Sequence, residues 1–141
     1  MASLPDSARE LLESAALAHL VTLNEDGSPH VTCVWVGLDG DEIVCAHTPH
    51  LRNRESIERD PRVAISIEAP GTEEMGLKRN LVVYGTARIT EGGAPELLQR
   101  LAHTYIGPEA DFPPMPNPPA GDITHITVDR VAGVGPWASG S

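Results

Sequence analysis

The chain has 141 residues, a formal net charge of −10 and two cysteines. Its length is that of one domain, which we expect to span residues 1–141, and its acidic balance argues against a nucleic-acid partner. No apolar run approaches the roughly 20 residues that cross a bilayer. No basic-then-apolar signal segment is present at the N-terminus, so we expect a cytoplasmic protein without membrane contact.

The first expected element is an amphipathic helix over residues 7–18, where Leu11, Leu12 and neighbouring alanines recur at helical spacing. Ser3 or Asp6 is available as its N-cap. Residues 19–23 and 28–36 then form two expected strands, joined by a tight turn that contains Asp26-Gly27.

A third strand is expected over residues 42–48, after a second Asp-Gly pair, and the chain then changes character. The segment 48–62, in which the strand ends and a helix is expected to begin, carries four of the ten basic residues: Arg52, Arg54, Arg59 and Arg62. Cations gathered at the start of a helix suit an anion such as a phosphate. The alternative is a solvated helix face on which arginines pair with Glu55 and Glu58.

The second half of the chain predicts two more strands, a helix and a last strand. They are expected over residues 62–68, 81–90, 94–106 and 122–134, with a loop at 69–78 and a proline-rich surface crossing at 108–119.

The fold class that follows is mainly β with inserted helices, a small barrel of about six antiparallel strands. Residues 31–36 are apolar on both faces, so the outer face of that strand needs cover from a helix, a ligand or another subunit. Cys33 and Cys45 lie inside strand patterns without metal-type spacing, and we expect them to be packed, reduced thiols. A structural metal is not expected, because no paired histidines accompany a carboxylate cluster.

The order of several segments resembles one known family. The segments are Leu23-Asn24-Glu25-Asp26-Gly27-Ser28-Pro29-His30-Val31-Thr32, Val34-Trp35-Val36, Arg59-Asp60-Pro61-Arg62-Val63-Ala64, Leu81-Val82-Val83-Tyr84-Gly85-Thr86-Ala87 and Gly135-Pro136-Trp137. Together they resemble the FMN-binding split β-barrel proteins related to pyridoxamine phosphate oxidase, and most closely the actinobacterial branch that uses the deazaflavin coenzyme F420. The resemblance implies a homodimer with two cofactor sites at the subunit interface.

The resemblance also implies roles for individual residues. The cofactor ring would lie along His30, Thr32 and Val34, while His47 and Thr48 would face its ribityl chain and phosphate. Arg52 matches the phosphate-binding arginine of the family. Asn53 departs from the lysine that many members carry there, and Arg54 is the expected replacement for that charge.

The resemblance implies two further residues at the same site, and the charges of two neighbouring basic residues add two more candidates. Asn80 would come from the other subunit to contact the ring, and Trp137 would approach with the C-terminal segment. Lys78 and Arg79, on the expected loop, would meet an anionic cofactor tail or only water. Trp137 is otherwise a packing anchor, and His30 otherwise a solvated strand residue.

The function implied is hydride transfer from reduced F420 to a conjugated small-molecule acceptor, which the sequence does not name. No catalytic side chain is expected, because in such chemistry the reactive atom belongs to the cofactor. One alternative is an FMN-binding oxidase or flavin reductase of the same family. Another is a non-catalytic protein that carries a flavin or deazaflavin.

Overall fold

The computed structural model describes residues 3–47, 52–73, 75–111 and 120–138. Within them, seven strands form one antiparallel sheet in the order β2-β1-β5-β6-β7-β4-β3. The strands are β1 (Ala18–Leu23), β2 (Pro29–Val34), β3 (Gly37–Asp39), β4 (Glu42–His47), β5 (Arg62–Thr72), β6 (Lys78–Glu91) and β7 (Asp122–Val134).

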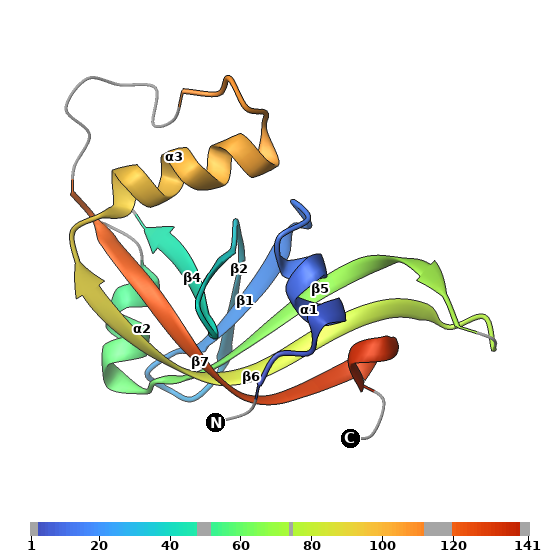
Figure 1. Cartoon of the computed structure of the whole chain (residues 1–141). Helices are drawn as coiled ribbons and strands as arrows, with labels where there is room; N and C mark the ends of the chain where they lie inside the picture. Colours follow the sequence, from blue (N-terminus) through green and yellow to red (C-terminus); the bar gives the residue numbers. More distant parts are fainter. Residues whose placement is uncertain (1–2, 48–51, 74, 112–119, 139–141) are drawn as a thin grey trace.

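The sheet curls into a barrel because its two edge strands are neighbours in the sequence. β2 and β3 lie at opposite edges of the sheet, yet only Trp35 and Val36 separate them along the chain. So short a connection forces the edges toward each other (Figure 1). The fold is therefore a mainly β split barrel, as the resemblance implied.

In the part of the chain that the structure describes, three α-helices and one short 3₁₀ helix surround the barrel. They are α1 (Asp6–Leu12), α2 (Arg52–Arg59), α3 (Ala94–Tyr105) and η1 (Pro136–Ala138). α3 lies across one end of the barrel (Figure 1), where its Leu97 and Leu101 pack against Val44 of β4. None of the described helices is long and apolar enough to cross a membrane.

The core lies inside the barrel and follows the two-residue period of the strands. Along β5, for example, Val63, Ile65 and Ile67 are buried while their neighbours are not. Leu81 and Val83 of β6 continue the same layer.

The opening helix is shorter than the sequence predicted. The prediction covered residues 7–18, but α1 ends at Leu12, and Ala15 takes a positive φ of 69° as the chain turns toward β1. The expected caps are also wrong, because Pro5 occupies the N-cap position and makes no side-chain hydrogen bond.

The hairpin between β5 and β6 is longer than expected. Residues 69–78 were expected to form a loop, but β5 continues to Thr72 and β6 begins at Lys78, so Lys78 and Arg79 lie on a strand. A register shift between Glu68 and Thr72 accommodates the Pro-Gly pair that suggested a loop. The hairpin forms an arm that projects from the barrel (Figure 1).

Smaller differences from the predicted elements occur at two places in the chain. The strand β3 was not expected, because three residues are too few to show a period. The second predicted strand, 28–36, is shorter in the structure and ends at Val34. Of the proline-rich crossing predicted at 108–119, residues 112–119 lie outside the described residues.

The two cysteines are both free thiols but differ in environment. Cys45 is fully buried, and burial raises the pKa of its thiol to about 12. Cys33 is exposed on β2, so the expectation that it is packed is wrong for the single chain.

The side chain of Tyr105 ties α3 to the point where the barrel closes. Its hydroxyl donates to the carbonyl oxygen of Ala16 at 2.8 Å and accepts from the Val36 N–H at 3.0 Å, and its ring stacks on Trp35. These bonds join α3, the segment before β1 and the connection between β2 and β3.

We predict that Tyr105→Phe lowers the free energy of unfolding by about 1–3 kcal/mol, because it leaves two part-buried backbone groups without their partner. The matched control is Thr104→Val, which removes a hydroxyl from the exposed neighbouring position of α3 and should change stability by less than about 0.5 kcal/mol. Urea unfolding of both variants measures the difference. Equal effects of the two substitutions would contradict this role of the Tyr105 hydroxyl.

Candidate cofactor site

Four elements meet at one corner of the barrel. His47, the last residue of β4, pairs with Asp122, the first residue of β7, and Asp122 also pairs with Glu91 at the end of β6. α2 begins at Arg52, a few residues after His47. The structure thus brings together the end of β4 and the start of α2, where the sequence predicted a phosphate site.

The side chain of Arg54 occupies this corner. Each of its three nitrogens donates to a carboxylate: Nε to Glu58 at 2.8 Å, Nη1 to Asp122 at 2.6 Å and Nη2 to Glu91 at 3.3 Å. The hydrogen bonds to Glu58, then to Asp122 and Glu91, raise the pKa of Arg54 above its usual value. Its guanidinium is therefore a cation at any working pH.

The other predicted residues of the corner are described only in part. Thr48 lies outside the described residues, and for His47, Arg52 and Asn53 the structure describes the backbone alone. Their roles toward a phosphate stay predictions.

The residues predicted to lie under the cofactor ring share one face of β2. His30, Thr32 and Val34 are half-buried and pair with residues of β1 that face the barrel interior. Val31 and Cys33 are exposed on the opposite face. The alternation agrees with the faces that the sequence assigned, although a ligand role for the inner face stays a prediction.

The remaining predicted residues lie far from this corner. Lys78, Arg79 and Asn80 begin β6, whereas Glu91 ends it. A strand of 14 residues separates these ends by roughly 40 Å along its course. One chain therefore does not bring Lys78 and Arg79 close to the arginines at the start of α2.

Contacts within the chain hold the start of β6 in place. Arg79 Nε lies 3.5 Å from the carboxylate of Glu73, and the Asn80 carbonyl accepts the indole N–H of Trp137 at 2.9 Å. Gly133 approaches the same carbonyl so closely that a Cβ there would collide with it. Trp137 is buried in the core cluster, so its packing role is evident in the single chain, and contact with a cofactor stays a prediction.

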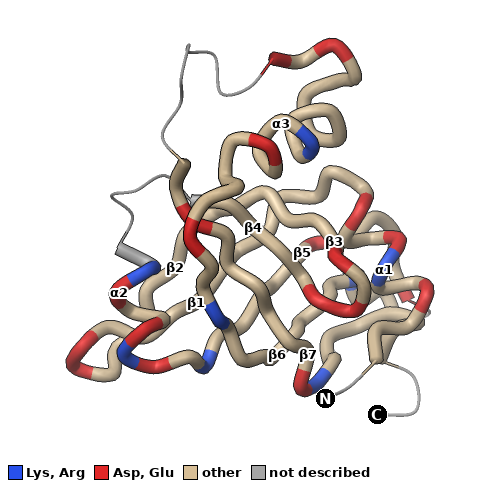
Figure 2. Tube along the Cα trace, turned by 60° about the vertical axis from the view of Figure 1, so that its left-hand side comes forward, with Lys and Arg blue, Asp and Glu red and all other residues tan. Residues whose placement is uncertain are grey.

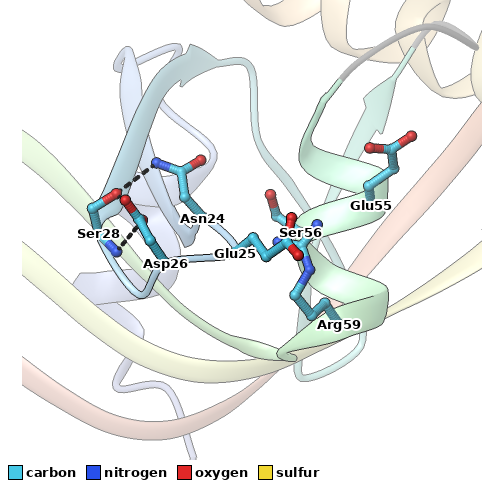
Figure 3. Close-up of a pocket in the computed structure, with 7 residues that line it drawn as sticks. All are labelled: Asn24, Glu25, Asp26, Ser28, Glu55, Ser56 and Arg59. Carbon is cyan, nitrogen blue, oxygen red and sulfur yellow. Dashed lines mark hydrogen bonds between the residues drawn. The ribbon is translucent and has the colours of Figure 1, made fainter.

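A groove of about 550 Å³ lies elsewhere, between the β1–β2 turn and α2 (Figure 3). Glu25, Asp26 and Glu55 line it together with Arg59, so carboxylates outnumber cations. None of its lining residues belongs to the predicted site. Its acidic lining makes it a poor place for an anionic cofactor.

Charge elsewhere on the molecule is also mostly negative. Figure 2 shows acidic residues spread over the surface and basic residues few and separated. Among the described residues, no group of His, Cys, Asp and Glu is arranged to hold a metal ion.

The sequence did not identify Asp122 or Glu91 as part of the corner. Both are strand-end residues far from Arg54 in sequence, and only the pairing of β6 with β7 brings them to α2. The one available signal was an acidic residue, Asp122, at the start of a predicted strand.

Known structures share this architecture. An F420 reductase is 25% identical, with a TM-score of 0.70, and the match covers 92% of this chain and 98% of that chain. A conserved hypothetical protein from Mycobacterium tuberculosis is 24% identical, with a TM-score of 0.71 and coverage of 98% and 88%. A heme binding protein from Mycobacterium smegmatis is 24% identical, with a TM-score of 0.61 and coverage of 94% and 53%. The last two likenesses show the fold alone.

Among curated proteins, no sequence matches this chain. The sequence model of the pyridoxamine 5'-phosphate oxidase family matches residues 4–135, which is nearly the whole chain. The chain therefore belongs to the pyridoxamine 5'-phosphate oxidase family.

Proposed function

We propose that the chain is a cytoplasmic, homodimeric oxidoreductase that transfers hydride from reduced coenzyme F420 to a conjugated organic acceptor. The observation that carries the proposal is the likeness to an F420 reductase over 92% of this chain, at 25% identity. In this proposal two copies of the chain together build the anion site.

The first step is the surface through which two copies associate. The outer face of the sheet carries two rows of side chains across five strands, and most of them are apolar or small. One row consists of Val31, Val21, Ala64, Tyr84 and Arg130, and the neighbouring row consists of Cys33, His19, Ser66, Val82 and Ala132. Val31 and Tyr84 are among the exposed large hydrophobic residues of the chain. An apolar face of this extent is typical of a subunit interface.

The second step is the distance between the two basic groups. Arg52 opens α2 at one end of β6, and Lys78 and Arg79 lie at its other end, roughly 40 Å away along a strand of 14 residues. A second copy with the opposite orientation can present its Lys78 and Arg79 to the first copy's α2. The proposed site therefore takes its phosphate ligand from one subunit and its tail contacts from the partner.

The third step is the choice between F420 and FMN. F420 carries a glutamate tail beyond its phosphate, so its binder needs cations that continue outward, whereas FMN ends at the phosphate. Lys78, which is exposed, and Arg79, which lies 3.5 Å from the single carboxylate of Glu73, supply two cations in a chain with a net charge of −10. This pair favours the longer anion.

The chemistry assigned to the chain itself is modest. The cofactor supplies the hydride chemistry, while the protein binds and orients it and keeps water away. We assign the ring contacts to His30, Thr32 and Val34 on β2 and to Asn80 of the partner subunit. The chain supplies no catalytic side chain in this proposal.

An FMN-binding oxidase or flavin reductase is the second candidate. The family match favours it, because the family takes its name from an oxidase of pyridoxamine 5'-phosphate and includes flavin-binding proteins. A non-catalytic carrier of either cofactor is the third candidate. Steady-state turnover with an acceptor separates a carrier from both enzymes.

For the cofactor, we predict micromolar or tighter binding of F420, weakened by added salt because the tail contacts are exposed. Fluorescence titrations with F420 and with FMN, run in parallel, measure both affinities. The double variant Lys78→Ala/Arg79→Ala should weaken F420 binding and leave FMN binding unchanged. Tighter binding of FMN than of F420 by the wild-type chain would favour the flavin candidate.

For the phosphate, we predict that Arg52→Ala weakens cofactor binding by about 1.5–3 kcal/mol, the range for charge-assisted hydrogen bonds. The matched control is Arg59→Ala, at an exposed position of the same helix, which should cost well under about 1 kcal/mol. Equal losses at both positions would indicate a diffuse electrostatic effect in place of a phosphate ligand.

For the assembly, we predict a homodimer by light scattering at micromolar concentration. The dimer should protect the Cys33 thiol from a thiol reagent, with labelling that speeds up on dilution, because Cys33 lies on the proposed interface. Cys45 adds no signal while the chain is folded, since it is fully buried, and Cys33→Ser should abolish labelling. A monomer whose Cys33 reacts at the same rate at every concentration would remove the interface site.

A further inference from the structure

Arg54 joins three elements through one side chain. Its carboxylate partners are Glu58 on α2 itself, Glu91 at the end of β6 and Asp122 at the start of β7. The partners differ in exposure: the side chain of Asp122 is 5% exposed, whereas those of Glu58 and Glu91 are 58% and 84% exposed. The bond to Asp122 is also the shortest of the three, at 2.6 Å.

The charge around Arg54 disfavours a phosphate. One cation faces three carboxylates within hydrogen-bond distance, so the cluster has a net charge of −2. A phosphate dianion placed on this guanidinium would be repelled by carboxylates that already occupy its nitrogens. Arg54 is thus poorly suited to replace the lysine that the family carries at the neighbouring position, Asn53.

The bond to Asp122 instead fixes where α2 begins. A buried carboxylate needs a cationic partner, and Arg54 supplies it from the first turns of α2. Asp122 is held in turn by its strand pairings with His47 and Glu91. The Arg54–Asp122 pair therefore ties the start of the helix to the ends of three strands.

We propose that Arg54 and Asp122 form a clamp that positions the start of α2, and with it Arg52, and that Arg54 is not itself a ligand of the cofactor phosphate. Both are positioning residues. The proposal rests on the proposed function, because it concerns the anion end of the same cofactor site.

The test is the cofactor affinity of Asp122→Ala, since the two roles of Arg54 predict changes of opposite sign. If Arg54 were a phosphate ligand, removing Asp122 would free its guanidinium and delete a negative charge, and binding would tighten. If the clamp positions α2, binding weakens, by roughly tenfold, because small displacements of a binding group cost such factors. Asp122→Asn keeps an acceptor oxygen for Arg54, should fold if the alanine variant does not, and should weaken binding less.

A second comparison separates positioning from direct contact at Arg54 itself. Arg54→Lys keeps the positive charge but loses the planar fork that reaches three carboxylates at once. The clamp predicts that Arg54→Ala binds the cofactor weakly but with the salt dependence of the wild-type chain, because no phosphate contact is lost, and that Arg54→Lys recovers part of the affinity by pairing with Asp122. A reduced salt dependence of cofactor binding in Arg54→Ala would overturn the proposal, because it would show that a direct phosphate contact had been lost.

The matched control is Glu42→Ala. Glu42 opens β4, at the opposite end from His47, and its carboxylate accepts from Arg88 at 2.8 Å. The variant removes the same charge and a comparable ion pair away from the corner, so affinity should change by less than about twofold. A loss equal to that of Asp122→Ala would overturn the clamp.

The experiment uses whichever of F420 and FMN the wild-type chain binds, because both carry a phosphate. A wild-type chain that binds neither overturns the proposed function and this inference together. A wild-type chain that binds one of them, with an Asp122→Ala variant that binds it more tightly, overturns the inference alone.

Discussion

The hydrogen-bonded ladders on both sides of β6 are the constraint on which the rest of the structure depends. β6 pairs with β5 and with β7, so one strand carries the projecting arm at its start and the corner with α2 at its end. Gly85 permits the register shift with β7, since a Cβ there would lie 2.5 Å from the Thr127 carbonyl oxygen. Because backbone groups inside a sheet have no other partners, β6 cannot fold back to join its own ends. Arg52, near the end of β6, and Lys78 and Arg79, at its start, can therefore contribute to one site only if they come from two different chains.

The strands were predictable where the residues alternate over a long enough run. β5 begins at Arg62, where the alternation of Val63, Ile65 and Ile67 predicted a strand, and α3 ends one residue before the predicted helix end. The predictions fail where local chemistry and tertiary pairing disagree. Pro70 and Gly71 favour a loop, but pairing across the arm holds Thr72 opposite Lys78. α1 stops early because the chain must turn into β1, which helix propensity does not encode.

The candidate site was predictable only as far as its residues are consecutive in sequence. The end of β4 and the start of α2 adjoin in the chain, so a strand-to-helix junction with arginines indicated an anion site. The surroundings of Arg54 were not predictable, since Glu91 and Asp122 reach it through strand pairing. That environment changes the interpretation of one residue: a cation that the sequence offers to a phosphate is already surrounded by carboxylates. The distance between Lys78 and the corner was likewise not predictable, because it depends on the observed length of β6.

The central claim, a cofactor site built from two chains, is tested most directly by mixing two defective variants. Arg52→Ala lacks the phosphate ligand, and Lys78→Ala/Arg79→Ala lacks the tail contacts, so each homodimer should bind F420 weakly. After unfolding and refolding together, a mixed dimer has one site with both defects and one intact site. The account predicts that tight F420 binding returns in about a quarter of all sites, the share expected for random pairing into dimers. No recovery of tight binding, in a mixture shown to contain mixed dimers, would contradict it.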